Sequence, residues 1–294
     1  MTMTTLREGS QRVLVTGATG TVGGHVVACL RDGPCEVCAA SRHPEAATSR
    51  LNIPAVYFDF QDPASYRSAF DGQDALFLVR PPAIARVWTS IFPALDMAVD
   101  SGIRHIVFLS LQGAEANPFV PHRWIEWKLA SIDVRATFLR PSFFMQNLTT
   151  THRHEVADER TLILPAGDGH TALIDARDVA DVAAHVIKHP KCGGGAYELT
   201  GLKAISYHTV ARVLSDVLGQ PIRYEEPSVI DFLRYSRRRG REWPFIFVMT
   251  GIYLTARFGL AARTTSTVHD LLGRPPRSFR TFAEDYAGVW AVAK

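Results

Sequence analysis

The sequence predicts an α/β fold in which helices cover both faces of a doubly wound parallel sheet, with a smaller α+β lobe toward the C-terminal end. Two observations carry this prediction. Short apolar runs alternate with helix-like segments through residues 12–139, and this alternation is typical of parallel sheets with right-handed crossovers. In the stretch of residues 12–27, an apolar run passes through a glycine-rich turn into a helix-like segment.

The glycine-rich turn has the spacing Gly-x-x-Gly-x-x-Gly. Strand, tight turn and helix together are the context of a dinucleotide-binding fingerprint. We expect Gly17 to allow the sharp turn, Gly20 to let the backbone approach a pyrophosphate, and Gly23 to let the helix pack close to the sheet. Free N–H groups at the helix N-terminus then favour phosphates. The predicted phosphate-binding residues are Gly17, Ala18, Thr19, Gly20, Thr21, Val22 and Gly23.

The end of the second predicted strand indicates which dinucleotide binds. An acidic residue about 20 positions past the glycines would bind the 2′-hydroxyl of NAD, but Ser41 and Arg42 stand there instead. A guanidinium beside a hydroxyl suits a 2′-phosphate. The sequence therefore favours NADPH over NADH as the cofactor, and a solvated loop arginine is the alternative.

The ends of the other predicted strands are further candidates, because ligands of such sheets lie beyond the carboxyl ends of the strands. Asp59 and Phe60 fall where an adenine sits in such folds, although a turn aspartate and a core aromatic explain them equally well. The fourth strand runs into Arg80 and two prolines, and a helix is expected over residues 84–101. Strand ends also hold Ser110, Gln112, Pro141, Ser142, Phe143 and Phe144.

Composition and charge narrow the possible partners. A net charge of +3 on 294 residues gives no indication of a nucleic acid or a membrane surface as partner. Cys35 and Cys38 lie three apart in a predicted strand, where such positions face opposite ways, so we expect no metal site and reduced thiols in a cytoplasmic protein. Residues 1–11 predict a frayed polar arm rather than a signal peptide. The most apolar stretch, residues 245–254, is too short to span a bilayer.

Two features of the C-terminal part have alternative interpretations. A basic run at the end of a predicted helix consists of Arg234, Arg237, Arg238, Arg239 and Arg241. Cations complement the dipole at a helix C-terminus, so a solvated face is favoured over an anionic partner. The apolar helix after Pro244 either packs into a core or forms the wall of a pocket for an apolar substrate.

Four segments together resemble the NmrA-like branch of the atypical short-chain dehydrogenase/reductases. These segments are residues 16–23, 139–147, 174–180 and 271–276. The resemblance covers nearly the whole chain. It implies a Rossmann dinucleotide-binding domain over residues 1–150 and a smaller substrate-binding lobe over residues 151–294, with the chain crossing back to the Rossmann sheet around residues 171–200.

The resemblance also implies which residues surround the ligands. Besides the glycine turn and Arg42, it implies cofactor contacts from Val79, Arg80 and Ser110. It places the nicotinamide near the end of the sixth strand. The residues beside it would be Pro141, Ser142 and Phe143, and the expected substrate pocket includes Gln112, Phe144, Asn147 and Trp243.

The sequence departs from the wider superfamily at the catalytic helix. Short-chain dehydrogenases carry a Tyr-x-x-x-Lys pair there, in which the tyrosine donates a proton. This helix has no tyrosine but holds His122, Glu126 and Lys128. Lys128 is a candidate for a ribose contact, and His122 and Glu126 share a helical face that either points at the cofactor or only forms caps and ion pairs. Ser110, as a lone hydroxyl, can only position a substrate oxygen.

These features favour an NADPH-dependent reductase of a small, apolar, conjugated acceptor that is quinone-, azo-, enone- or imine-like. Hydride transfer to such acceptors can rely on proximity, with water as the proton source. The alternative is a non-catalytic NADP(H)-binding redox sensor or regulator, and a third possibility is an isomerase or lyase that retains the cofactor. We expect a small-molecule substrate and a monomer or homodimer.

Overall fold

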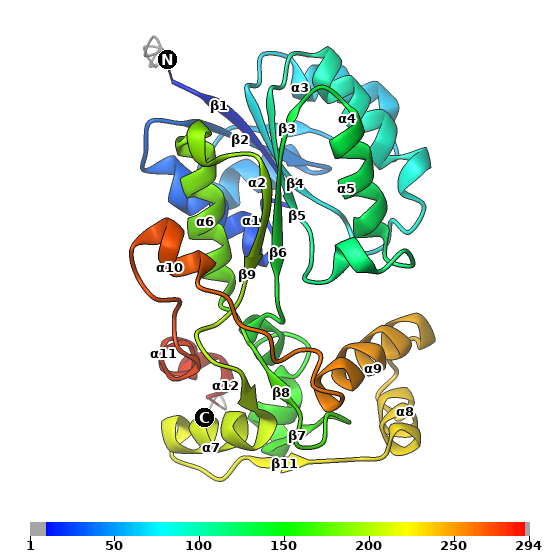
Figure 1. Cartoon of the computed structure of the whole chain (residues 1–294), viewed down its shortest axis with the longest axis vertical. Helices are drawn as coiled ribbons and strands as arrows, with labels where there is room; N and C mark the ends of the chain where they lie inside the picture. Colours follow the sequence, from blue (N-terminus) through cyan, green and yellow to red (C-terminus); the bar gives the residue numbers. More distant parts are fainter. Residues whose placement is uncertain (1–9, 292–294) are drawn as a thin grey trace. The chain divides into compact units, whose positions relative to one another are not determined.

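The structure, a computed structural model, describes residues 10–291 (Figure 1). The chain forms two compact units. The first contains the residues up to Pro141 together with Ala176–Leu199, and the second contains Ser142–Asp175 and the residues from Thr200 onward. Most of the N-terminal arm expected over residues 1–11 lies outside the described residues. The domain boundary placed at residue 150 stays a prediction.

The first unit contains a seven-stranded sheet with the order β3-β2-β1-β4-β5-β6-β9, and every pairing in it is parallel. The strands are β1 (Arg12–Thr16), β2 (Glu36–Ser41), β3 (Ala55–Tyr57), β4 (Ala75–Val79), β5 (His105–Leu109), β6 (Arg135–Pro141) and β9 (Gly195–Leu199). The order runs outward in opposite directions from β1 and β4. This confirms the predicted doubly wound sheet and puts its switch point, where ligands of such folds bind, at the carboxyl ends of these two strands.

The middle of this sheet is buried on both faces. Residues 13–15 of β1 are β-branched or leucine and are completely buried, as expected for a strand covered by helices on both sides. At the mouth of the sheet, the hydroxyl of Thr16 accepts a hydrogen bond from the N–H of Val79 at 2.7 Å and donates one to the carbonyl of Phe77 at 3.1 Å. The Thr16 side chain therefore ties the end of β1 to β4 where the backbone pairing stops.

Helices cover both faces of the sheet (Figure 1). One face carries α1 and α6, which pack against each other, and α3, α4 and α5 pack on the opposite face, while α2 lies beside β2 and β3. These helices are α1 (Thr21–Arg31), α2 (Pro44–Leu51), α3 (Tyr66–Phe70), α4 (Ile91–Asp100), α5 (Pro121–Ser131) and α6 (Ala176–Lys188). In α6 the buried Val179, Val182, Ala183 and Val186 recur at helical spacing, which explains its contact face.

The helix predicted over residues 84–101 is shorter than expected. It begins at Ile91, and a separate 3-10 turn, Val87–Thr89, precedes it. The cause is Pro93, which lacks an N–H group and whose ring clashes with the preceding turn, so that it is accepted only in the first turn of a helix.

The second unit combines small sheets with helices, as the predicted α+β lobe requires. Strand β8 (His170–Thr171) pairs antiparallel with β10 (Ile205–Ser206), and β7 (Thr161–Ile163) pairs parallel with β11 (Arg223–Glu225). The helices are α7 (Tyr207–Leu218), α8 (Val229–Arg238), α9 (Trp243–Arg257), α10 (Thr267–Leu272), α11 (Phe279–Asp285) and α12 (Ala287–Trp290). Within residues 10–291, no helix combines the length and apolarity needed to cross a bilayer.

The core of the second unit is built around Tyr253 of α9. Its ring lies 5.8 Å from that of Phe143, 5.9 Å from that of Tyr207 and 6.0 Å from that of Phe232, measured between ring centroids. Burial raises the pKa of Tyr253, and its hydroxyl is hydrogen bonded to Nε2 of His152. Because the buried Tyr253 hydroxyl needs this hydrogen-bond partner, the bond favours a single packing of the aromatic side chains in this core.

Candidate functional site

A cleft of about 480 Å³ opens at the carboxyl ends of the central strands of the first unit. It lies at the switch point between β1 and β4, where the fold favours ligand binding. The lining residues come from the ends of β1, β2 and β4, from the chain after β3 and from the proline turn after β4: Thr16, Gly17, Thr19, Gly20, Ala40, Ser41, Arg42, His43, Phe58, Asp59, Phe60, Gln61, Val79, Arg80, Pro81, Pro82, Ala83 and Ile84.

The glycines of the turn between β1 and α1 occupy positions that other residues fit poorly. Gly17 has φ of 61°, in the left-handed region that favours glycine. A Cβ on Gly23 would lie 2.2 Å from the carbonyl oxygen of Gly17, so only glycine lets α1 pack this closely. A Cβ on Gly20 would lie 3.1 Å from the same oxygen. The bare backbone of this turn forms a cradle that side chains would otherwise fill.

The N-terminus of α1 is well suited to an anion. Gly20 is the N-cap residue, and the first turn, residues 21–24, carries no charged side chain. The first N–H groups of a helix have no partner inside the helix and carry the positive end of its dipole. A phosphate at this turn would meet both the free N–H groups and the dipole.

Polar and aromatic side chains follow β2 and β3 at the rim of the cleft. The Arg42 side chain is exposed, and Ser41 Oγ accepts a hydrogen bond from the backbone N–H of His43 at 3.0 Å. Asp59 Oδ1 accepts one from the N–H of Gln61 at 2.9 Å, which is a turn-forming bond. Phe60 is buried in the first unit's core. Asp59 and Phe60 thus have structural roles and also line the cleft.

Arg80 holds the proline turn after β4. Its Nη1 donates to the carbonyls of Pro81 at 3.0 Å, Pro82 at 3.2 Å and Ile84 at 2.8 Å. Burial lowers the pKa of Arg80. The prolines of this turn lack N–H groups, so the turn has few backbone donors of its own. The hydrogen bonds from Arg80 hold its carbonyls in place and so fix one wall of the cleft.

A buried ionic network lies behind Ser110 at the end of β5. The Ser110 hydroxyl donates to Oε1 of Glu126 at 2.6 Å, and Arg140 donates to the same carboxylate from Nε at 3.0 Å and from Nη2 at 2.6 Å. Only 3% of Glu126 is exposed. A second carboxylate, Glu115, lies 3.2 Å from Nη1 of Arg140. The hydrogen bond to Glu126 raises the pKa of Arg140, so its guanidinium stays charged, and the proton of Ser110 points to Glu126.

His122 and Lys128, the other two catalytic candidates, have different surroundings. The His122 ring is stacked on Phe108 with centroids 5.8 Å apart, and burial together with the charge of Arg80 lowers the pKa of His122 to about 3. Its imidazole is therefore neutral near pH 7. Lys128 Nζ forms an ion pair with Oδ1 of Asp96 at 2.5 Å, which engages its ammonium between α4 and α5.

Several buried polar atoms around the strand ends lack a partner within the part of the chain that the structure describes. They are Nε of Arg80, Nε2 of Gln112 and Nδ1 of His122. Buried groups without hydrogen bonds are rare because they are costly, and a bound ligand would supply partners. Together with the glycine cradle, these atoms fit a polar ligand that extends from α1 toward β5.

Comparison with known proteins agrees with this architecture. The NmrA-like family model matches residues 9–236. The chain belongs to the NmrA-like family. It is 34% identical over 95% of its length to a (4-alkanoyl-5-oxo-2,5-dihydrofuran-3-yl)methyl phosphate reductase of Streptomyces griseus, 99% of which is covered. It is 30% identical over 96% of its length to an NAD(P)H azoreductase of Xenophilus azovorans, covering 100% of that protein.

Solved structures share the fold of this chain. The NADPH-dependent quinone oxidoreductase of Escherichia coli, crystallised with NADPH, superposes with a TM-score of 0.85 at 25% identity and covers 94% of this chain and 99% of its own. The Rossmann-type fold expected from the resemblance is therefore confirmed.

In this NmrA-like chain, the residues expected beside the nicotinamide divide between the two units. Pro141 ends β6 in the first unit, and Ser142 begins the second, where its hydroxyl donates to the carbonyl of Ala172. Phe143 packs against the core of the second unit. Among the expected pocket residues, Phe144 forms a bridge with Ile174. The contact of these residues with cofactor or substrate stays a prediction.

Asn147 and Trp243, the remaining pocket candidates, lie in different parts of the second unit. The backbone N–H of Asn147 donates to the carbonyl of Phe144 at 3.2 Å in a short 3-10 turn. Trp243 begins α9 and lines a surface depression with residues of α8.

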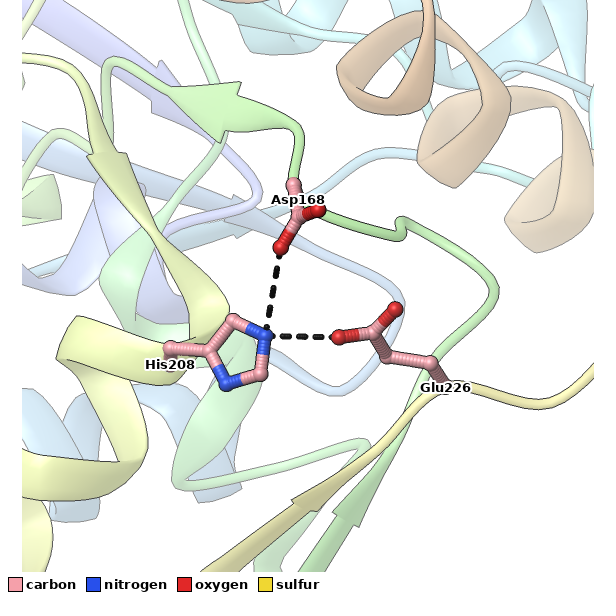
Figure 2. A group of neighbouring side chains, drawn as sticks. All are labelled: Asp168, His208 and Glu226. Carbon is pink, nitrogen blue, oxygen red and sulfur yellow. Dashed lines mark ion pairs between the residues drawn. The ribbon is translucent and has the colours of Figure 1, made fainter.

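One side-chain group outside the cleft could hold a metal ion. Figure 2 shows His208 of α7 between the carboxylates of Asp168 and Glu226, with Nε2 lying 3.4 Å from Oδ1 of Asp168 and 2.6 Å from Oε1 of Glu226. All three side chains are exposed, and His208 already forms ion pairs with both acids. The geometry is explained by these ion pairs, which join α7 to the chain around β7 and β11.

Sequence reasoning missed the partners of Glu126. A signal was present, because Glu126 lies between Ile125 and Leu129 on the buried stripe of α5. A carboxylate on a buried face requires a partner. The partner Arg140 is on a strand, however, and no local spacing pairs the two residues.

Proposed function

We propose that this protein is an NADPH-dependent reductase of a small, apolar, conjugated acceptor that is quinone-, azo-, enone- or imine-like. The observation that carries the proposal is the cradle formed by Gly17, Gly20 and Gly23 in front of the α1 N-terminus, with Arg42 at the rim of the same cleft. The names of the relatives support the reductase class: an azoreductase, a butenolide-type phosphate reductase and a quinone oxidoreductase.

The chain's own residues would hold NADPH along the cleft. The turn of residues 17–23 would bind the pyrophosphate through backbone N–H groups. Ser41 and Arg42 would bind the 2′-phosphate, and Asp59 and Phe60 would border the adenosine. The end of β4, at Val79 and Arg80, would continue this wall toward Ser110. Bound NADPH supplies a hydride, and the proposed work of the protein is to orient the two reactants and exclude competing reactions.

Ser110 would act as an acceptor at this site. Its proton is directed to the Glu126 carboxylate at 2.6 Å, so only its lone pairs remain for a ligand N–H group. This differs from the expectation that Ser110 positions a substrate oxygen, which would require the proton. In our proposal Ser110 orients a ligand amide or hydroxyl donor.

His122 would serve as a neutral hydrogen-bond donor. A pKa of about 3 leaves almost no imidazolium at neutral pH, so His122 cannot act there as a strong general acid. A neutral imidazole N–H can still polarise an acceptor oxygen or nitrogen. Proton delivery would then come from water, which suffices for conjugated acceptors whose reduced form is a stabilised anion.

A redox sensor is the second candidate, and a specific observation favours it. Helix α5 has no tyrosine, and the hydroxyl and ammonium groups nearest the superfamily's catalytic places, on Ser110 and Lys128, are engaged with Glu126 and Asp96. A protein of this kind would bind NADP(H) without turnover and pass its state to a partner.

The test is oxidation of NADPH followed at 340 nm with menadione, a monoazo dye and a cyclic enone as acceptors. The reductase proposal expects turnover with at least one acceptor, faster with NADPH than with NADH. His122→Gln should lower kcat, whereas His269→Gln, an exposed position on α10, should not. Tight NADPH binding with no oxidation by any acceptor would reject the reductase and favour the sensor.

A further inference from the structure

The surface formed by α8 and the first half of α9 presents large apolar side chains to solvent. Trp243 is 44% exposed, Phe245 40%, Phe247 60% and Val248 61%. The rings of Trp243 and Phe247 stack with centroids 5.7 Å apart. Contiguous exposed apolar surface of this kind marks an interaction site rather than an ordinary protein surface.

The exposed residues surround much of the helix. At about 100° per residue, the four positions cover an arc of roughly 200°, whereas the buried positions of α9 cover an arc of roughly 120° on the other side of the helix. Those buried positions are Ile246, Met249, Thr250, Tyr253 and Ala256. A flat protein partner covers one stripe of a helix. An arc this wide is better matched by a fluid lipid layer into which the end of the helix can sink.

Cations border this apolar surface. Arg234, Arg237 and Arg238 line a depression of about 610 Å³ together with Ile230, Leu233 and Trp243. The guanidinium of Arg237 lies 5.8 Å from the centre of the Trp243 ring. Tryptophan next to arginine is the combination found where proteins contact the headgroup region of a bilayer.

The charges around the surface leave a cationic face. Arg239 pairs with Glu159, and Arg241 with Glu155, so these two arginines are neutralised. Among residues 10–291, neither Arg237 nor Arg238 pairs with an acid.

The acids on these two helices are few. Asp231 lies 3.5 Å from Arg234, and Glu242 is exposed at the N-cap of α9. The balance of the exposed side chains is positive, and it disfavours a second copy of the same face because the arginines of two copies would repel each other.

We propose that the α8–α9 surface docks on an anionic membrane surface. The ring of Phe247, the side chain of Val248 and neighbouring apolar groups would enter the headgroup–acyl boundary, while Arg237 and Arg238 contact lipid phosphates. Such peripheral binding depends on both buried apolar area and attraction to anionic lipid. No membrane contact was expected from the small net charge of the whole chain. That net charge does not reveal a local excess of arginines on one surface.

The experiment is vesicle flotation of the full-length protein without cofactor or acceptor, so that its outcome is independent of the proposed reductase activity. The probes are vesicles of pure phosphatidylcholine and of phosphatidylcholine with 30% phosphatidylglycerol. We expect the protein to float with the anionic vesicles and several-fold less with the neutral ones. Raising the salt concentration should weaken binding, because surface charges are screened.

Matched variants locate the contact. Phe247→Ser with Val248→Ser, and separately Arg237→Glu with Arg238→Glu, should each reduce the bound fraction several-fold. Phe119→Ser, at a position that is 92% exposed in the first unit, and Arg50→Glu with Arg67→Glu should leave it unchanged.

The proposal is overturned if the wild-type protein does not float with anionic vesicles, or if the surface variants float as well as the wild type. Analytical ultracentrifugation provides the other decisive outcome. Self-association that disappears in the Phe247→Ser/Val248→Ser variant would assign the surface to a second copy of the chain instead.

Discussion

The cleft of the first unit and the α8–α9 surface of the second differ in what determines them. At the cleft, backbone geometry requires glycine at position 23, because a Cβ there would lie 2.2 Å from the carbonyl oxygen of Gly17. Such required glycines have a characteristic spacing, which can be recognised in the sequence. At the α8–α9 surface, side chains such as Phe247 lie in open solvent, and nothing in the fold requires their identity. The function of the first region can therefore be predicted from the sequence. The second region is recognised only in the structure, by its large exposed apolar side chains.

The largest effect is expected at the glycine turn. Gly23→Ala should destabilise the protein by about 3 kcal/mol, because a methyl group cannot fit against the backbone of Gly17. The matched control is Gly24→Ala in the same helix turn, where the added Cβ lies 3.4 Å from the Ala18 carbonyl and alanine favours the helix. Urea unfolding of both variants measures the difference. Equal stability of the two would show that the close approach is not a constraint.

The next effect tests the buried ion pair of the first unit. Glu126→Ala removes three hydrogen bonds and leaves Arg140 without its main partner, which should cost about 2 kcal/mol after allowance for the solvent that reaches Arg140. Asp96→Ala, which breaks the partly exposed pair with Lys128, should cost less than about 1 kcal/mol. Chemical denaturation compares the two. A loss at Asp96 as large as that at Glu126 would contradict the account.

Acid should destabilise the first unit through two histidines whose pKa values are lowered in the folded state. The folded-state pKa of His122 is about 3 and that of His105 about 4, both lowered mainly by burial, whereas an unfolded histidine titrates near 6.5. Between these values the unfolded chain binds more protons, so stability falls as pH decreases below about 6.5. His122→Gln should reduce this slope by about 1 kcal/mol per pH unit.

Thermal or urea unfolding at several pH values measures that slope. The matched control is His269→Gln, at an exposed position on α10. A His122→Gln protein with an unchanged slope would mean that this imidazole is accessible to water in the folded state.

The smallest effect is expected at the α8–α9 surface. Phe247→Ser with Val248→Ser should change the free energy of unfolding by less than about 0.5 kcal/mol for each residue, because exposed side chains contribute little to folding. Calorimetric unfolding checks this. A large loss would show that these residues belong to the core, and the surface would no longer be free for a membrane.

The sequence predicts the parts of the molecule that depend on local pattern. The parallel strands follow from the alternation of apolar runs with helix-like segments, and the turn at Gly17 follows from its spacing. The helix expected from residue 84 begins only at Ile91, because Pro93 is tolerated only in the first turn of a helix.

Contacts between distant residues could not be predicted in the same way. The Glu126–Arg140 pair joins a helix to a strand, and the carbonyls held by Arg80 depend on how the proline turn folds. The sequence also does not predict which apolar side chains of α9 are exposed. These features depend on packing, and a single sequence carries no periodic signal for them.

The most direct test of the nucleotide site is calorimetric titration of the wild-type protein and Arg42→Ala with NADPH and NADH. Loss of a charge-assisted contact costs about 1.5–3 kcal/mol, so we expect NADPH affinity to fall roughly tenfold or more in the variant while NADH affinity stays the same. Arg50→Ala, at an exposed position on α2, should bind both as the wild type does. Equal NADPH affinity in wild type and Arg42→Ala would contradict the 2′-phosphate assignment, and binding of neither dinucleotide would contradict the account of the cleft.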